Sequence, residues 1–305
     1  MITLDNLRKD FGAFTAVDGI SLEVGAGETV VLLGTSGCGK TTTLRMINRL
    51  IRPTAGIVRV EGRDIAAEDP VQLRRKIGYM IQGIGLFPHR TVEENILTVP
   101  RLLGWSQPRS RDRIAELCGI MNLEAGLLPR YPHELSGGQL QRVGLARALA
   151  ADPPIVLMDE PFGALDPITR QQVRREFRRI ESLVSKTIVL VTHDIAEAVE
   201  LGDRICLMSQ GRIEQVGPAA ELLFRPRTDF VRGFFAFGRL QTEWMALKLV
   251  DLPAAAALAP ALSAQTTVAD ALAQLEQSDR AAFLGVMAAF FAQKQVLASD
   301  HGDPV

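Results

Sequence analysis

The chain has 305 residues, enough for one large domain with an appendage or for two modest domains. Its formal net charge of −1 at pH 7 argues against nucleic acid as the main partner, because proteins that bind phosphate backbones usually carry a clear basic excess. The three cysteines, Cys38, Cys118 and Cys206, lack the spacing of a disulfide framework or a zinc site, which fits a reducing cytosol. We also expect no secretion signal, because no basic segment followed by an apolar core stands at the N-terminus. No membrane span is expected either, because the sequence has no run of apolar residues long enough for one.

Short strands and turns are predicted for the first sixty residues, where Gly25–Glu28 and Glu61–Asp64 carry turn residues. The apolar run 28–33 predicts a buried strand, and the segment 42–50 has the apolar spacing of a helix. The pattern from 91 to 150 is helical, with breaks near Gly104 and Pro129. The N-terminal half therefore combines a strand-rich part with a helical part.

Strands and helices alternate after Pro154. Apolar runs at 155–158 and 187–191 have the composition of strands buried on both faces, and a helical pattern covers 166–183. This alternation predicts a mostly parallel α/β sheet that is interrupted by the helical insertion. Beyond Phe230 the composition shifts toward Ala and Leu, so we place a boundary near Gly238 and expect a frayed end after residue 300.

The segment Gly34–Thr41 is a complete G-x-x-x-x-G-K-[ST] phosphate loop between a predicted strand and a predicted helix, which is the context that this motif requires. Its glycines let consecutive backbone N–H groups turn toward an anion, and the helix N-terminus adds a positive dipole. Lys40 can reach the β- and γ-phosphates, and Thr41 can place its hydroxyl on Mg²⁺. Cys38 is either a reactive thiol or a residue that fills the loop. The motif predicts binding of a nucleoside triphosphate.

Two carboxylates, Asp159 and Glu160, directly follow the predicted strand 155–158. At the carboxyl edge of a parallel sheet Asp159 can hold Mg²⁺ beside the phosphates, and Glu160 can polarise an attacking water. An acidic pair can equally start a helix, because the helix dipole favours carboxylates there. The phosphate loop upstream favours the catalytic interpretation.

The segment Leu135–Gln139 reads LSGGQ and precedes a strongly helical run over 140–149. Ser136 is a natural helix N-cap, which is the purely structural interpretation. The two glycines at a helix start also form a second candidate anion site. One nucleotide in one protomer does not explain two such sites, whereas two protomers that face each other do.

Together these motifs resemble the ATP-binding cassette (ABC) ATPases. The phosphate loop is similar to their Walker A motif, Ile155–Asp159 to Walker B and Leu135–Gln139 to the family signature. The same order continues in four further positions. Gln82 resembles the Q-loop glutamine, Ala164–Asp166 the D-loop, His193 the switch histidine, and Phe11 the aromatic residue under adenine, where Tyr is commoner.

The resemblance implies a P-loop NTPase core of the ABC ATPase type, an α/β fold. The family adds an antiparallel β subdomain and an α-helical signature subdomain, here over about residues 86–150. A short, mostly helical C-terminal appendage would follow. The implied domains are a nucleotide-binding domain over 1–238 and the appendage over 239–305.

The resemblance also implies a head-to-tail homodimer with ATP and Mg²⁺ between the protomers, each site taking the signature of the opposite chain. The implied catalytic residues are Glu160, His193, Gln82 and Lys40, and the implied Mg²⁺ ligands are Thr41, Gln82 and Asp159. The implied ATP-binding residues are Phe11, Gly34, Thr35, Ser36, Gly37, Cys38, Gly39, Lys40, Thr41, Thr42, Ser136, Gly137, Gly138, Gln139 and Asp166.

A single Walker A motif and the lack of a sustained heptad pattern are typical of transport members of this family. The implied partners are separate permease chains and an extracytoplasmic solute-binding protein, with no nucleic acid, and the implied location is the cytoplasmic face of the cell membrane. The alternative is a soluble regulatory or repair ATPase that has no membrane partner.

Three segments resemble the glycine betaine/carnitine/choline (osmoprotectant) importers, namely 45–51, Ile81–His89 and Thr91–Ile96, although Gly83 departs from the second Gln often found there. Quaternary-amine uptake is therefore expected, with a polyamine, an amino acid or another small solute as the alternative. Thr267–Leu275 resembles the opening helix of a CBS module. The tail is too short for a pair of such modules, which predicts a degenerate remnant that packs on the cassette or helps it to dimerise.

Overall fold

The computed structural model describes residues 1–184, 186–236, 238–252, 255 and 259–299. They form two compact units, of which the first comprises Met1–His193 with Met208–Ile213 and the second Asp194–Leu207 with the chain from Glu214 onward. The predicted domain boundary near Gly238 stays a prediction. The predicted frayed end at 301–305 lies outside the described residues.

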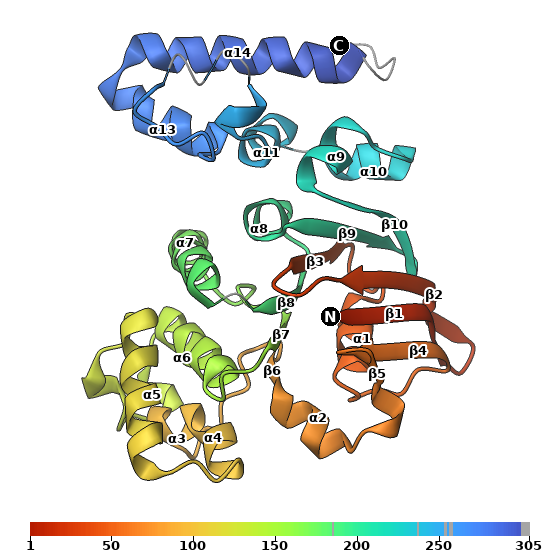
Figure 1. The fold of residues 1–305 in the computed structure, drawn as a ribbon, viewed down its shortest axis with the longest axis vertical. Coiled ribbons are helices and arrows are strands. Elements are labelled where there is room, and N and C mark those ends of the chain that lie inside the picture. The colour runs from red at the N-terminus through yellow and green to blue at the C-terminus, as the bar shows by residue number, and fades with distance from the viewer. Residues whose placement is uncertain (185, 237, 253–254, 256–258, 300–305) are drawn as a thin grey trace. The chain divides into compact units, whose positions relative to one another are not determined.

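An antiparallel sheet of the first unit has the strand order β2-β1-β4-β5 (Figure 1). Side chains alternate at the start of β1, where Ile2 and Leu4 are buried, and a register shift after Leu4 brings Leu7 to the buried side as well. The antiparallel β subdomain expected from the sequence is confirmed. Its strands are β1 (Ile2–Phe11), β2 (Phe14–Val24), β4 (Ala55–Val60) and β5 (Arg63–Asp64).

The second sheet has the order β10-β9-β3-β8-β7-β6, and β3, β8, β7 and β6 are parallel. Every residue of β3, β7 and β8 is buried, as expected for strands that are covered on both faces. The carboxyl ends of these three strands share one edge and lead into Gly34, Asp159 and His193. The strands are β3 (Thr29–Gly34), β6 (Ile77–Met80), β7 (Ile155–Asp159), β8 (Thr187–Thr192), β9 (Arg204–Ser209) and β10 (Arg212–Gly217).

A helical insertion separates β6 from β7, and its helices α3 to α6 lie together in Figure 1. α3 starts with a capping box in which Thr91 and Glu94 bond to each other's backbone. The expected helical subdomain is confirmed. The helices of the first unit are α1 (Lys40–Ile47), η1 (Ile65–Ala67), α2 (Pro70–Lys76), α3 (Val92–Ile96), α4 (Thr98–Leu102), α5 (Gln107–Ile120), η2 (Ala125–Leu127), η3 (Pro132–Glu134), α6 (Gly137–Leu149) and α7 (Pro167–Val184).

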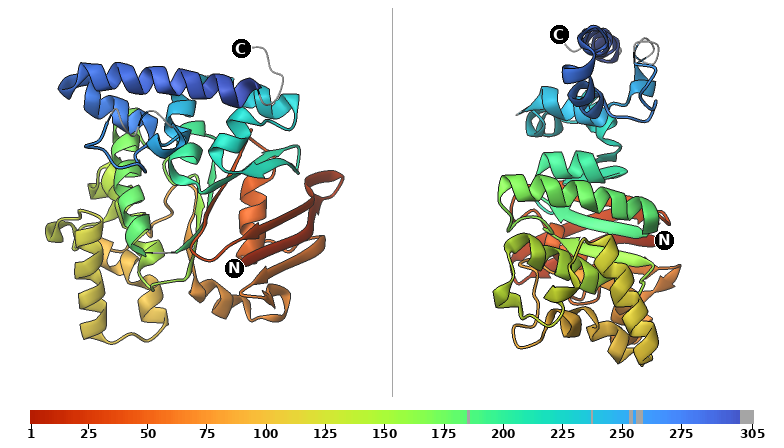
Figure 2. Two further views of the ribbon diagram at one scale, coloured as in Figure 1. Left: turned by 45° about the horizontal axis from the view of Figure 1, so that its top comes forward. Right: turned by 90° about the vertical axis from the view of Figure 1, so that its left-hand side faces the viewer.

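The second unit is mostly helical, and its described part after residue 238 is helical as expected for the appendage, with α13 and α14 side by side (Figure 2). α13 begins after Thr267, whose hydroxyl oxygen accepts a hydrogen bond from the N–H of Asp270 and so caps the helix. No strand follows β10 in the described part of the chain, apart from an isolated bridge between Lys248 and Thr267. Among the described residues no helix has the length and apolarity needed to cross a membrane. The helices are α8 (Ile195–Leu201), α9 (Ala219–Phe224), α10 (Asp229–Phe234), α11 (Arg239–Ala246), η4 (Leu249–Asp251), α13 (Val268–Ser278) and α14 (Arg280–Ser299).

Candidate functional site

The phosphate loop connects β3 to α1, and its backbone requires glycine at two points. Gly34 has a φ of 152°, and a Cβ there would lie 2.2 Å from the carbonyl oxygen of Met208. Gly39 has a φ of 103°, and its Cβ would lie 2.5 Å from the carbonyl oxygen of Ala16. No side chain of the described residues caps the N-terminus of α1, so its first N–H groups are available to an anion.

Lys40 is the first residue of α1, and its side chain reaches back to the start of the loop. Its Nζ donates to the carbonyl oxygens of Gly34 and Thr35 at 2.8 Å each and lies 3.7 Å from Sγ of Cys38. Cys38 is only 3% exposed, and its sulfur would be 2.8 Å from a Cβ at position 34. Of the two interpretations of Cys38, this packing favours the residue that fills the loop.

The exposed side of the loop is formed by Thr35, Ser36 and Gly37, while Thr41 and Thr42 on α1 are half-buried. Backbone and side-chain groups that a phosphate could reach are therefore at the surface, and the residues that shape the loop are buried beneath them. This distribution agrees with the predicted role of the motif.

Thr41 and Asp159 are joined by a hydrogen bond of 2.8 Å from the threonine hydroxyl to Oδ1 of the aspartate. Asp159 ends β7 and is completely buried, and its Oδ2 has no hydrogen-bond partner among the described residues. Burial raises the pKa of this carboxyl, while the bond from Thr41 lowers it. A buried carboxylate oxygen without a partner, beside a threonine hydroxyl, is what a cation ligand needs.

Glu160 is held between two of the other predicted catalytic residues. Its Oε2 accepts a hydrogen bond of 3.0 Å from Nε2 of Gln82, and its Oε1 lies 3.3 Å from Nδ1 of His193. The backbone of Glu160 has a φ of 48°, in the left-handed region that non-glycine residues seldom adopt, and its N–H donates to Val191 at 2.9 Å. Backbone strain of this kind is typical of functional positions.

The signature segment starts α6. Ser136 and Gln139 form a reciprocal capping box, with distances of 3.3 Å to Oγ of Ser136 and 2.9 Å to Oε1 of Gln139. The structural interpretation of Ser136 as an N-cap is therefore confirmed. Ser136 and Gly137 are exposed. A Cβ on Gly138 would lie 3.1 Å from Thr169, so this glycine packs against α7.

Asp166 of the predicted D-loop is the cap of α7. Its Oδ1 accepts hydrogen bonds of 3.1 Å from the N–H groups of Ile168 and Thr169. The hydrogen bonds from Thr169 lower the pKa of Asp166. The carboxylate is thus charged and oriented by its own helix.

Phe11 ends β1, and its side chain is 49% exposed, with Nζ of Lys9 5.0 Å from the ring centroid. One face of the ring is therefore available for stacking.

The structure brings together two groups of the predicted site residues. Thr41 of the phosphate loop is bonded to Asp159, and Gln82 and His193 both contact Glu160. The signature segment is separate from both groups. In Figure 1 α6 lies with α3 to α5, away from α1.

Arg147 is a residue of this region that the sequence reasoning missed. Its guanidinium donates to the carbonyl oxygens of Ile84 and Gly85 at 2.8 and 2.7 Å, which fixes α6 to the segment that follows Gln82. Ile84 has a φ of 69°, a genuine outlier for a β-branched residue. Burial lowers the pKa of Arg147. The glycines on both sides of Ile84 indicated irregular backbone, but no pattern indicated the arginine that holds it.

Comparisons with known proteins agree with this geometry. Residues 17–163 match the ABC transporter family. The glycine betaine uptake system ATP-binding protein YehX of Escherichia coli (strain K12) is 51% identical over 250 residues, which cover 82% of this chain and 81% of YehX. This chain belongs to the ABC transporter family. It is accordingly an ATP-binding protein of the ABC ATPase type.

Other members of the ABC family are similar to a comparable degree. The choline transport ATP-binding protein OpuBA of Bacillus subtilis (strain 168) is 51% identical over 241 residues, 79% of this chain and 63% of OpuBA. The chain therefore spans less than two thirds of the length of that relative. A solved dimeric structure of the cassette MJ0796 in a post-hydrolysis state, bound to ADP and Pi, covers 71% of this chain and 97% of that one, with a TM-score of 0.64 and 36% identity.

Proposed function

We propose that this chain is the ATP-hydrolysing subunit of a membrane importer that takes up a quaternary amine such as glycine betaine, carnitine or choline. The observation that carries the hydrolytic part is Glu160, held between Gln82 and His193 at the edge of the sheet where the phosphate loop begins. The names of the relatives YehX and OpuBA support the substrate class.

In this proposal Glu160 is the base that orients and polarises the attacking water. His193 and Gln82 hold its two oxygens, so the carboxylate is positioned before a substrate arrives. Lys40 would exchange its bonds to the loop carbonyls for bonds to the β- and γ-phosphates, and the N–H groups at the start of α1 would hold the same charge. Phe11 would stack on adenine.

The residues present fit Mg²⁺. Asp159 offers a buried oxygen without a partner among the described residues, and Thr41 offers a hydroxyl bonded to the same carboxylate. Together with Gln82 they form a small set that substrate phosphates would complete, which is how Mg²⁺ is usually bound beside nucleotides. The ion would neutralise charge on the phosphates when bound.

A second copy of the chain would complete the site with its signature. Ser136 and Gly137 are exposed at the start of α6, and that helix does not lie beside α1. ATP bound at the phosphate loop would be contacted by Ser136, Gly137, Gly138 and Gln139 of the opposite protomer. Hydrolysis removes the γ-phosphate contact, so the nucleotide would control the association of the two chains.

Permease chains and an extracytoplasmic solute-binding protein would be the other partners, and the subunit would lie on the cytoplasmic face of the membrane. The test is to co-purify the chain with its permease and to measure ATP hydrolysis with solute-binding protein loaded with each of several quaternary amines. Stimulation by at least one amine is expected, with a polyamine and an amino acid as comparisons. Stimulation by the comparison solutes alone would contradict the substrate class, and a chain that hydrolyses ATP without any permease association would contradict the importer.

A further inference from the structure

Three segments of the first unit meet at Asp18, outside the groups used by the proposed chemistry. Asp18 lies on β2, Gly211 in the turn between β9 and β10, and Cys38 in the phosphate loop. The N–H of Asp18 donates to the carbonyl oxygen of Gly211 at 2.8 Å, and the N–H of Gly211 donates to that of Cys38 at 3.2 Å. Two consecutive backbone hydrogen bonds thus lead from β2 to the phosphate loop.

The carboxylate of Asp18 joins the same turn to β1. Its Oδ2 accepts two hydrogen bonds from Arg212, from Nε at 2.9 Å and from Nη2 at 2.7 Å, and its Oδ1 accepts one from Nη1 of Arg8 at 2.5 Å. Both carboxylate oxygens of Asp18 therefore accept hydrogen bonds, Oδ1 from Arg8 and Oδ2 from Arg212. Charge-assisted bonds from a guanidinium fix direction as well as distance.

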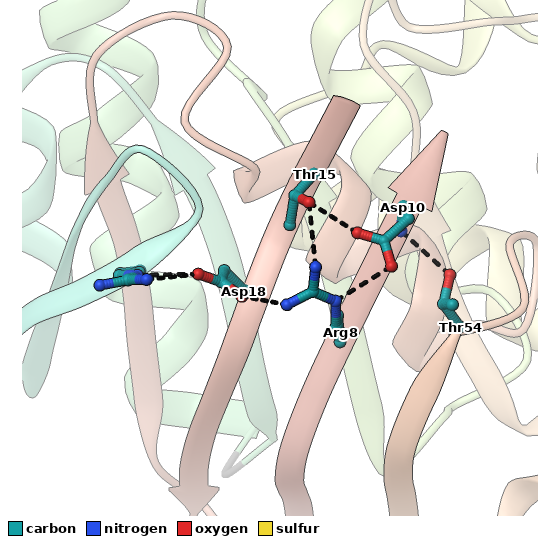
Figure 3. A network of polar contacts seen from close by, with 6 residues as sticks. Arg8, Asp10, Thr15, Asp18 and Thr54 are labelled. Atoms are coloured by element: carbon teal, nitrogen blue, oxygen red, sulfur yellow. Dashed lines mark hydrogen bonds and ion pairs between the residues drawn. The ribbon is translucent and has the colours of Figure 1, made fainter. Parts of the chain in front are cut away.

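Arg8 continues the network to the hairpin that carries Phe11 (Figure 3). Its Nε donates to Oδ2 of Asp10 at 3.0 Å, and its Nη2 donates to Oγ1 of Thr15 at 3.2 Å, while Thr15 donates to Oδ1 of Asp10 at 2.7 Å. Asp10 and Thr15 are cross-strand partners next to the pair formed by Phe11 and Phe14. The network therefore holds the turn end of the β1–β2 hairpin.

The packing at this point leaves little room for adjustment. Gln210 and Gly211 have φ values of 46° and 80°, the backbone of a tight two-residue hairpin turn of type I′. A Cβ on Gly211 would lie 3.1 Å from the carbonyl oxygen of Ala16, and a Cβ on Gly39 would lie 2.5 Å from the same oxygen. The backbone of β2 is therefore in close contact with both the turn and the phosphate loop.

We infer that Asp18 is a positioning residue that sets the placement of the base-binding hairpin relative to the phosphate loop. The inference rests on the proposed function, because it takes Phe11 as the stacking partner of adenine. A ligand that contacts both ends of the site binds weakly if the two ends are misplaced, whereas a ligand that uses one end only is unaffected. Asp18 is 24% exposed and its partners Arg8 and Arg212 are 42% and 72% exposed. Ion pairs that reach solvent in this way add little to global stability, so the effect of Asp18 is expected in the site rather than in the fold.

The experiment compares ATP with inorganic tripolyphosphate, which carries the phosphates but no base. In Asp18→Asn, calorimetric titration should show an ATP Kd raised about threefold to tenfold, with the tripolyphosphate Kd within about twofold of wild type. Arg212→Gln leaves the bond between Asp18 and Arg8 in place. It should therefore raise the ratio of the ATP Kd to the tripolyphosphate Kd by less than Asp18→Asn does. Thermal unfolding of each variant checks that the fold is retained.

Two further variants make the result specific. Asp5→Asn removes an exposed pair of 3.5 Å with Arg59 in the same sheet and should leave the ratio unchanged. Phe11→Ala should weaken ATP but not tripolyphosphate. If Phe11→Ala leaves ATP binding unchanged, the proposed adenine site is wrong. If Phe11→Ala weakens ATP selectively while Asp18→Asn changes neither ligand, or weakens both equally, the inference about Asp18 alone is overturned.

Discussion

Nε2 of Gln82 donates a hydrogen bond of 3.0 Å to Oε2 of Glu160, across 78 positions of sequence. The bond joins the segment after β6 to the residue after β7, so the position of Gln82 helps to orient the carboxylate of Glu160. Arg147 holds the backbone of Ile84, two residues after Gln82. These bonds connect α6 of the helical insertion to the proposed base through the segment around Gln82. A partner that binds the helical insertion can therefore change the orientation of Glu160 without contacting the nucleotide.

Replacing Glu160 by Gln should retain ATP binding and remove turnover. The amide keeps the size of the side chain but cannot accept a proton, so kcat should fall by about 10²- to 10⁴-fold while the ATP Kd stays within about twofold. Size-exclusion chromatography with ATP should then show a trapped dimer. Glu61→Gln is the matched control, because Glu61 is an exposed glutamate with a φ of 52°. Unchanged hydrolysis in Glu160→Gln would remove Glu160 from its role.

Replacing Arg147 by Met should release the segment after Gln82 from α6. The variant loses two hydrogen bonds to strained backbone, so Glu160 would be less well positioned, and kcat should fall about tenfold with ATP affinity nearly unchanged. Single-turnover kinetics would distinguish a slower chemical step from slower product release. Arg111→Met, at an exposed position on α5, serves as control. Equal losses in kcat and in ATP affinity would show that Arg147 only supports the fold.

Part of the candidate site was predictable, because several of its proposed residues follow buried strands in a recognisable local pattern. The phosphate loop, Asp159 and His193 all come after apolar runs whose carboxyl ends must share one edge of a parallel sheet. The contacts of Asp18 and Arg147 were not predictable. They join segments far apart in sequence through single arginines, and an arginine on a strand or helix has no local pattern that names its partner.

Replacing Lys40 by Ala should weaken nucleotide binding itself. Lys40 is the buried cation of the loop, and the variant removes its charge from the β- and γ-phosphates, so the ATP Kd should rise at least about tenfold. Lys76→Ala, which removes an exposed lysine 3.9 Å from Glu68, provides the control in the same titration. Full ATP affinity in Lys40→Ala would contradict the assignment.

Replacing Asp159 by Asn should stabilise the nucleotide-free protein and remove the benefit of Mg²⁺. Burial raises the pKa of Asp159 above its ordinary value of 3.8, so the charged form is disfavoured in the folded state. Its stability contribution is therefore favourable at pH below that ordinary value and is lost as the pH rises through the raised pKa. At pH 7 the variant should be more stable by about 1 kcal/mol.

The measurement for Asp159→Asn is thermal unfolding at pH 7, with and without Mg²⁺ and ATP. The variant should unfold about 2 °C higher than wild type without ligands. With ATP, added Mg²⁺ should raise the melting temperature of wild type and leave that of the variant unchanged. A variant that is less stable without ligands, or that keeps the full Mg²⁺ effect, would show that the carboxylate has a structural role only.

Replacing Glu243 by Ala should destabilise the second unit and leave ATP binding intact. Glu243 is completely buried and pairs with Arg239 at 2.8 Å and Lys294 at 2.7 Å, so it joins α11 to α14. Loss of the carboxylate leaves two cations facing each other at a buried position, which should cost about 2–4 kcal/mol. Because both cations are partly exposed, the lower part of that range is expected.

Tryptophan fluorescence can report this unit separately. Trp244 lies on α11 with its ring 6.2 Å from that of Phe290 on α14, and Trp105 is the only other tryptophan in the chain. In a Trp105→Phe background, denaturant unfolding followed at Trp244 should shift to lower denaturant for Glu243→Ala. Glu276→Ala, at an exposed position on α13, should not shift it. An unshifted transition in Glu243→Ala would show that the ion pairs contribute nothing to the packing of α11 on α14, because the desolvation of the three charges then cancels their attraction.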